Sequence, residues 1–169
     1  MSEPILKLEG LKKYFNTTTG GAFNKKKAVL KAVDGIDLEV NPGETIGLVG
    51  ESGCGKTTAG RTILKLYEPT DGKIIFNGED ITNYSPAKMK PLRREMQMIF
   101  QDPFASLNPR QTVGTIIANM FEIQGITPPG GVENEVRALM ERVGLNPEHL
   151  NRYPHEFSGG QRQRIGVAR

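Results

Sequence analysis

Short apolar runs separated by turn-forming residues fill the N-terminal part of the chain. Residues 5–9 alternate between apolar and polar side chains, which is typical of a half-exposed strand. Residues 29–33 and 36–40 predict two further short strands, and Asp34-Gly35 predicts a turn between them. The polar, glycine-rich residues 16–27 predict a surface loop. Together these runs predict a small antiparallel sheet.

Two later apolar runs predict buried strands of a parallel sheet, which typically lack the alternation of a half-exposed strand. Residues 45–49 read TIGLV, and residues 96–100 read MQMIF and end just before Gln101. Between them, residues 73–76 and their sequel flank Asn77-Gly78, a strong hairpin signal. The chain is therefore expected to contain both hairpins and buried strands that pair with strands distant in the sequence.

Helical signals dominate the second half of the chain. Ser85-Pro86 predicts a helix start, with serine as the N-cap and proline at the first position, and this helix is expected to run to about residue 94. Residues 113–121 and 132–143 carry apolar stripes at helical spacing, and Gly144 predicts the end of the second stripe. We interpret the methionines of these stripes as core residues, because methionine fills irregular interiors.

Length and composition predict a globular protein of ordinary domain size. The chain has 169 residues, 37% hydrophobic and 24% charged, with no apolar run near the ~18 residues of a membrane span. The N-terminus lacks the layout of a signal peptide. The single cysteine, Cys54, excludes an internal disulfide and favours a reducing compartment. Net charge is only +3, and we interpret the basic run at residues 25–27 as a solvated loop rather than a nucleic-acid surface.

Residues 50–58, GESGCGKTT, match the phosphate-loop pattern G-x-x-x-x-G-K-[ST] at every fixed position. The expected strand at residues 45–49 precedes them. Ala59, Ile63 and Leu66 follow at i, i+4 and i+7, which is helical spacing. The motif thus stands between a strand and a helix, the context that supports it. A glycine-rich turn that carries a lysine by chance is the alternative.

The residue types of this loop suit the binding of a nucleoside triphosphate. Its glycines permit backbone angles and close approaches that a side chain would block. The amides of residues 53–57 can then point at phosphate oxygens, at the positive end of a helix. Lys56 can reach the β- and γ-phosphates, and the hydroxyl of Thr57 can ligate Mg²⁺.

A second candidate anion site begins at Ser158. Ser158 and Gln161 have the spacing of a capping box, S-x-x-Q. Gly159 and Gly160 stand in the first turn, where each glycine costs ~1 kcal/mol relative to alanine. Bare amides at a helix N-terminus form an anion site, so a phosphate ligand would account for these glycines. A capped helix with no ligand is the alternative.

The two motifs together give the chain a resemblance to the ATP-binding subunits of ABC transporters. Residues 50–58 resemble the Walker A loop, Gln101 resembles the Q-loop glutamine, and residues 157–161 resemble the signature motif. The family consensus for the signature is LSGGQ, and Phe157 replaces its leucine. The resemblance covers essentially the whole chain.

The resemblance assigns roles to particular residues. ATP would be bound by Phe15, Gly50, Glu51, Ser52, Gly53, Cys54, Gly55, Lys56, Thr57 and Thr58. Lys56 and Gln101 would act in catalysis, and Thr57 and Gln101 would hold Mg²⁺. The ATP of a partner subunit would contact Ser158, Gly159, Gly160 and Gln161. Phe15 falls where the family places an aromatic ring that stacks on adenine; Tyr14 is the second candidate, and ordinary packing is the alternative for Phe15.

The fold implied by the resemblance is α/β: a P-loop NTPase core of the ABC ATPase type, with an antiparallel β subdomain and an α-helical subdomain. We expect the core and β subdomain at about residues 1–101, the helical subdomain at about 102–157, and the signature with the start of its helix at 157–169. The family continues with an Asp-Glu strand, a D-loop and a switch histidine. We expect these C-terminal parts to be absent, and residues 1–169 alone to be inactive as an ATPase.

A finer likeness concerns residues 96–110 and 155–165, which are similar to the ATPases of dipeptide and oligopeptide importers. It implies ATP-driven uptake of peptides or related small solutes by a protein at the cytoplasmic face of the membrane. The implied partners are a second ATPase subunit, identical or homologous, two integral-membrane permease subunits and, indirectly, an extracytoplasmic solute-binding protein, with no nucleic acid. A soluble ABC ATPase unrelated to transport and a fragment that only binds nucleotide are the alternatives.

Overall fold

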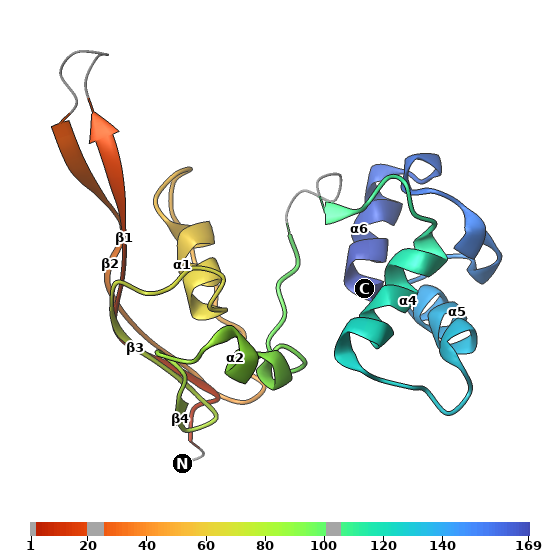
Figure 1. Cartoon of the computed structure of the whole chain (residues 1–169), viewed down its shortest axis with the longest axis horizontal. Coiled ribbons are helices and arrows are strands. Elements are labelled where there is room, and N and C mark those ends of the chain that lie inside the picture. Colours follow the sequence, from red (N-terminus) through yellow and green to blue (C-terminus); the bar gives the residue numbers. More distant parts are fainter. Residues whose placement is uncertain (1–2, 20–25, 101–105) are drawn as a thin grey trace. The chain divides into compact units, whose positions relative to one another are not determined.

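The computed structural model describes residues 3–19, 26–100 and 106–169, which fall into two compact units (Figure 1). The first unit spans Met1–Met98 and holds the sheet, and the second spans Ile99–Arg169 and is helical. Each unit has a hydrophobic core of its own. The two units are therefore described separately.

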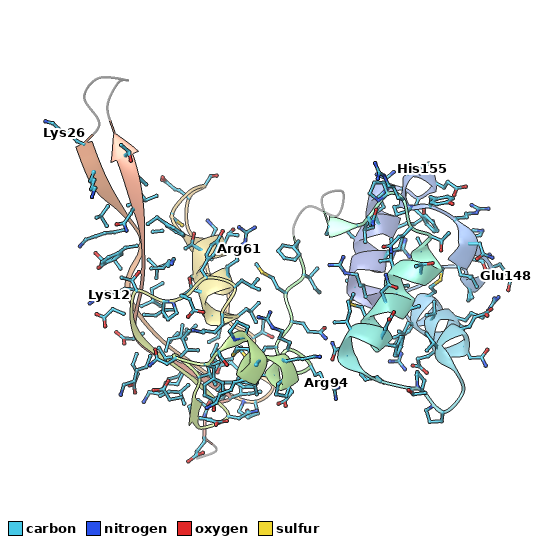
Figure 2. All side chains as sticks on the ribbon, viewed as in Figure 1. Lys12, Lys26, Arg61, Arg94, Glu148 and His155 are labelled. Carbon is cyan, nitrogen blue, oxygen red and sulfur yellow. The ribbon has the colours of Figure 1, made fainter. Side chains whose placement is uncertain are left out.

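The sheet of the first unit has four strands in the order β2-β1-β3-β4, all antiparallel. Its strands are β1 (Leu6–Thr19), β2 (Lys26–Val40), β3 (Asp71–Phe76) and β4 (Glu79–Asp80). β1 pairs with β3 only from Leu6 to Lys12, whereas it pairs with β2 as far as Thr19. The β1–β2 hairpin thus continues beyond β3 as a two-stranded ribbon, whose start at Lys12 is marked in Figure 2.

The hairpin differs from the sequence prediction at two places. Residues 16–19 and 26–27, expected in a loop, belong to β1 and β2, because the two strands continue to pair through Thr19 and Lys26. Asp34-Gly35 makes no turn. Leu11 pairs with Ile36 and Lys12 pairs with Asp34, so Gly35, at φ 82°, is the extra residue of a β-bulge inside one continuous strand. A glycine with positive φ serves a bulge as readily as a turn.

The other predicted turn and cap of this unit are confirmed. Asn77 and Gly78 connect β3 to β4 with φ of 50° and 79°, the positive angles of a tight hairpin turn. Helix α2 (Pro86–Leu92) begins after Ser85, whose side chain accepts a hydrogen bond from the amide of Lys88. Helix α1 (Lys56–Ile63) follows the glycine-rich loop. The core beneath the sheet consists of Leu8, Leu11, Ile74, Phe76, Ile81 and Met89.

The two predicted parallel strands are wrong: neither residues 45–49 nor residues 96–100 form a strand. A strand exists only when its amides and carbonyls pair with a neighbour, and none of the described strands pairs with either segment. Most of their apolar side chains are exposed, Val49 by 93% and Ile99 by 65%, whereas Met96 and Met98 are half-buried. The apolar pattern predicts that the two segments are buried, and the described residues do not cover them.

The described helices of the second unit pack around one core. The helices are α4 (Val113–Gln124), α5 (Val132–Arg142), η1 (Pro147–Asn151), η2 (Pro154–Glu156) and α6 (Gly159–Ala168). The predicted helical stripes are confirmed: Val113, Ile117, Val136 and Met140 are all buried. Gly144, at φ 72°, follows the last turn of α5 as predicted. Throughout the described part of the chain, helices are too short or too polar to cross a bilayer.

Candidate nucleotide-binding site

The loop that leads into α1 is closed around the amino group of Lys56. This group donates hydrogen bonds to the carbonyl of Gly50 at 2.6 Å and to that of Glu51 at 2.7 Å, and it lies 3.4 Å from Sγ of Cys54. The amide of Cys54 donates to the carbonyl of Glu51 at 3.3 Å, which closes a turn within the loop. The lysine thus points back across the loop that it follows.

The loop glycines differ in how strongly the geometry around them requires glycine, and Gly55 is the most constrained. Gly55 is the N-cap of α1 at φ 101°, and a Cβ there would lie 2.1 Å from the carbonyl oxygen of Ala32 on β2. A Cβ on Gly50 would lie 2.6 Å from Sγ of Cys54. Gly53, at φ 84°, has open space around it but a backbone angle that favours glycine. This spacing of glycines lets the loop turn tightly against β2.

The two threonines at the start of α1 differ in their exposure to solvent. Thr57 is exposed in the first turn, so its hydroxyl is available to a ligand. Thr58 is half-buried, and its carbonyl accepts a hydrogen bond from the hydroxyl of Thr62 at 2.7 Å. Glu51 and Ser52 are exposed at the tip of the loop. Within the described ranges, no three His, Cys, Asp or Glu side chains come together as a metal site.

Phe15 lies in the same unit, on the two-stranded part of the β1–β2 hairpin. Its half-buried ring meets the ring of Tyr67 edge to face, with centroids 5.5 Å apart and planes at 87°. The amino group of Lys13 lies over the Phe15 ring, 4.9 Å from its centroid. Tyr67 and Lys13 were not among the predicted site residues. Tyr67 lies far along the chain in the segment that follows α1, and no local pattern connects it with Phe15.

Tyr14, the second candidate for base stacking, has other partners. Its hydroxyl donates a hydrogen bond to the carboxylate of Asp34, which raises the pKa of Tyr14 above its ordinary value and lowers that of Asp34. Lys31 binds the same carboxylate at 3.1 Å and lies over the Tyr14 ring, 5.3 Å from its centroid. The contacts of Tyr14 therefore tie the two strands of the hairpin together.

Of the remaining predicted residues, Gln101 lies outside the described residues, and the signature lies in the second unit. There Ser158 caps α6: its hydroxyl accepts from the amide of Gln161 at 3.3 Å, and the side chain of Gln161 accepts from the amide of Ser158 at 2.9 Å. This reciprocal pair is the predicted capping box. An added Cβ on Gly159 or Gly160 would meet none of the described residues within 4 Å, apart from its chain neighbours and the backbone of its own helix.

A glycine-rich loop that precedes a helix and closes around its own lysine, in a unit built on an antiparallel sheet, is the arrangement of a P-loop protein. The family model described as ABC transporter matches residues 33–169. This chain belongs to the ABC transporter family.

Curated relatives match the chain over nearly its whole length. The oligopeptide transport ATP-binding protein AppF of Bacillus subtilis is 53% identical over 168 residues, which is 99% of this chain and 51% of AppF. The glutathione import ATP-binding protein GsiA of Escherichia coli K12 is 50% identical over 167 residues, 99% of this chain and 27% of GsiA. The chain spans about half the length of the first of these relatives.

Solved structures support the fold. The chain is similar to the ATP-binding cassette MJ0796 in its dimeric, post-hydrolysis state with ADP and Pi, with a TM-score of 0.78 and 22% identity, over 96% of this chain and 67% of that one. It is similar to CbiO1 from Clostridium perfringens with a TM-score of 0.73 and 24% identity, over 99% of this chain and 61% of that one. The predicted fold class is confirmed at the level of the ABC ATPase fold, although the parallel strands are not formed.

Proposed function

We propose that this chain is the nucleotide-binding part of an ABC importer subunit that uses ATP to take up peptides or related small solutes. The observation that carries the proposal is the loop of residues 50–58, closed around Lys56 at the start of α1. The names of the relatives, which refer to oligopeptide transport and glutathione import, support peptides as the solute class. Glutathione is itself a small peptide.

The loop has the donor set that a nucleoside triphosphate and Mg²⁺ need. Lys56 would exchange the carbonyls of Gly50 and Glu51 for phosphate oxygens, which are stronger acceptors because they are charged. The exposed hydroxyl of Thr57 would ligate Mg²⁺, and Gln101 would join it. ATP with Mg²⁺ supplies the phosphoryl group that is transferred to water. The chain contributes positioning and positive charge, the main means by which P-loop proteins catalyse this transfer.

The residues of the signature would serve a second subunit. Gly159 and Gly160 open α6 with open space around them, between the capping pair Ser158 and Gln161, which suits a phosphate group presented from outside. Two subunits in a head-to-tail dimer would each place this helix start on the nucleotide of the other. Two permease subunits in the membrane would convert the closing and opening of that dimer into uptake, at the cytoplasmic face.

The proposal is tested by nucleotide binding and by uptake in the intact protein. Lys56→Ala is expected to weaken ATP binding by at least tenfold, about 1.4 kcal/mol, because the lysine charge no longer meets the phosphates. Lys90→Ala, at an exposed lysine of α2, is the matched control and should leave affinity unchanged. Titration of a fluorescent ATP analogue measures both. Equal affinities of Lys56→Ala and the unmodified protein would contradict the phosphate assignment.

The transport part of the proposal has its own measurement. Cells that lack the subunit should fail to accumulate a labelled oligopeptide, and the unmodified protein should restore uptake where Lys56→Ala does not. The intact protein should also co-purify with integral-membrane subunits. ATP binding without membrane partners would instead favour a soluble ABC ATPase.

A further inference from the structure

The segment that follows α1 is fastened along β1 next to Phe15. The amide of Thr70 donates to the carbonyl of Lys12 at 2.8 Å, and the hydroxyl of Thr70 accepts from the amide of Tyr14 at 2.9 Å. The amino group of Lys13 donates to the carbonyl of Glu68 at 2.8 Å. These bonds bring Tyr67 to the point where β3 stops pairing with β1 and the hairpin continues as two strands.

Tyr67 connects the ring of Phe15 to helix α1. One edge-to-face contact joins the two rings, at 5.5 Å between centroids. At its other end, the hydroxyl of Tyr67 accepts a hydrogen bond from the guanidinium of Arg61 at 2.9 Å, and the guanidinium lies 5.7 Å from the ring centroid. Arg61 stands on α1, the helix that begins with Lys56, and Figure 2 labels its side chain there. The three side chains are half-buried.

Side-chain contacts have more influence at Phe15 than at earlier residues of β1. From Leu6 to Lys12, β1 has a paired strand on each side; at Phe15 its only paired strand among the described residues is β2, through Leu30. Two-stranded ribbons are only marginally stable alone and twist more than larger sheets. The position of the Phe15 ring relative to α1 is therefore set largely by Tyr67 and Arg61.

We propose that Tyr67, held by Arg61, is a positioning residue for nucleotide binding. It fixes the distance between the Phe15 ring and the loop residues Lys56 and Thr57. At that distance, one nucleotide can stack its base on Phe15 and place its phosphates at Lys56 and Thr57. The inference rests on the proposed function. Lys13, with its amino group over the Phe15 ring, adds a cation–π contact to the same cluster. Tyr67 acts through Phe15 and makes no contact with the phosphates.

A positioning role and a purely structural role differ in which ligand they affect. Loss of a structural residue would weaken the whole unit and lower affinity for every ligand of the loop. Loss of a positioning residue for the base lowers affinity for ATP but not for inorganic tripolyphosphate, which has no base to stack. The ratio of the two affinities therefore isolates the proposed role.

The experiment compares leucine variants in the intact protein by calorimetric titration with ATP and with tripolyphosphate. Tyr67→Leu is expected to weaken ATP binding about fivefold, in the range of one aromatic contact, and to leave tripolyphosphate binding unchanged. Phe15→Leu should do the same. Tyr84→Leu, at a half-buried tyrosine that packs against the core of the same unit, is the matched control and should change neither affinity.

Double and conservative variants complete the design. Phe15→Leu combined with Tyr67→Leu should weaken ATP binding no more than Phe15→Leu alone, because Tyr67 acts only through the ring. Tyr67→Phe keeps the ring and loses the bond from Arg61, so an intermediate loss of about twofold is expected. If Tyr67→Leu does not fold, Arg61→Gln gives the same test through the hydroxyl, with the same twofold loss for ATP alone.

Each result decides the inference. Equal losses for ATP and tripolyphosphate, an unchanged affinity for ATP in Tyr67→Leu, or additive losses in the double variant would overturn it. If Phe15→Leu weakens ATP binding and Tyr67→Leu does not, only the positioning role fails and the proposed function stands. If the unmodified protein binds neither ligand, the proposed function fails together with the inference.

Discussion

The loop of residues 50–58 and the start of α6 at residues 158–161 are both glycine-rich helix beginnings, but their glycines have different reasons to be there. In the loop, a Cβ on Gly55 would lie 2.1 Å from the carbonyl oxygen of Ala32, at a backbone φ of 101°. At the start of α6, Gly159 and Gly160 are helical residues, and an added Cβ would meet none of the described residues outside that helix within 4 Å.

This difference separates glycines that the fold requires from glycines that it does not. The fold of the first unit needs Gly55, whatever the loop binds. None of the described residues of the second unit needs Gly159 or Gly160, and each glycine lowers helix stability relative to alanine. A residue that weakens its own helix without an internal reason indicates a requirement outside the unit. The loop of residues 50–58 would thus be built around the ligand of its own subunit. The start of α6 would be left open for a ligand bound to another subunit.

The largest effect is expected from Gly55→Ala. The clash with Ala32 and the positive φ together should lower the free energy of unfolding by about 3 kcal/mol. Gly43→Ala is the matched control: it has φ 76° but open space, so it should cost only about 1 kcal/mol. Urea unfolding of both variants measures the difference. Equal costs would mean that the contact with β2 does not constrain the loop.

Next in size is the effect of Ser158→Arg on assembly. A long charged side chain at this helix start should abolish ATP-dependent dimerisation, more than tenfold in dimer affinity, while ATP binding by the separate subunit is retained. Ser85→Arg removes the cap of α2 and should leave the dimer intact. Analytical ultracentrifugation with and without ATP gives the readout. A Ser158→Arg protein that still dimerises would reduce Ser158 to a helix cap.

Labelling of Cys54 tests whether phosphates bind over the loop of residues 50–58. Its thiol is exposed and lies 3.4 Å from the amino group of Lys56, so phosphates bound there should cover it. Maleimide labelling is expected to slow about tenfold at an ATP concentration ten times the dissociation constant. Tripolyphosphate should protect equally, and adenosine should not. Unchanged labelling at saturating ATP would count against phosphate binding over Cys54.

The smallest effect is expected from Gly160→Ala. Because its surroundings are open, alanine should raise the free energy of unfolding by about 0.5 kcal/mol and, at the same time, weaken the ATP-dependent dimer. Gly166→Ala, in the same helix and equally open, should stabilise the protein without affecting the dimer. A Gly160→Ala variant that destabilises the subunit would show that the fold needs this glycine after all.

Signals that act within a few residues were predicted correctly from the sequence. The turn at Asn77-Gly78, the N-cap at Ser85 and the capping box of Ser158 with Gln161 all form as expected. Each depends on side chains or backbone angles of neighbours in the chain. The helical stripes of α4 and α5 were also predicted, because their period decides which face is buried.

Features that depend on distant neighbours were not predicted. Asp34-Gly35 has the local signature of a turn, but continuous pairing with β1 makes it a bulge. Residues 45–49 have the composition of a buried strand. A strand also requires a neighbouring strand to pair with, and the local sequence pattern does not identify that neighbour. The same limit applies to the candidate site: the glycine spacing predicted the loop, whereas the contact of Tyr67 with Phe15 results from the packing of two distant segments.

The unequal pairing along β1 has a consequence for the rate at which its amides exchange hydrogen with solvent. Between Leu6 and Lys12 the strand is flanked on both sides, whereas from Tyr14 to Thr19 its only paired neighbour among the described residues is β2. Local opening is cheapest where the fewest bonds must break. Exchange protection should therefore fall along β1 in the direction of the hairpin end, and Phe15 lies just past the step. A nucleotide that stacks on Phe15 would extend the well-protected part of β1 towards the hairpin end. Exchange would then slow at backbone amides that do not contact the nucleotide.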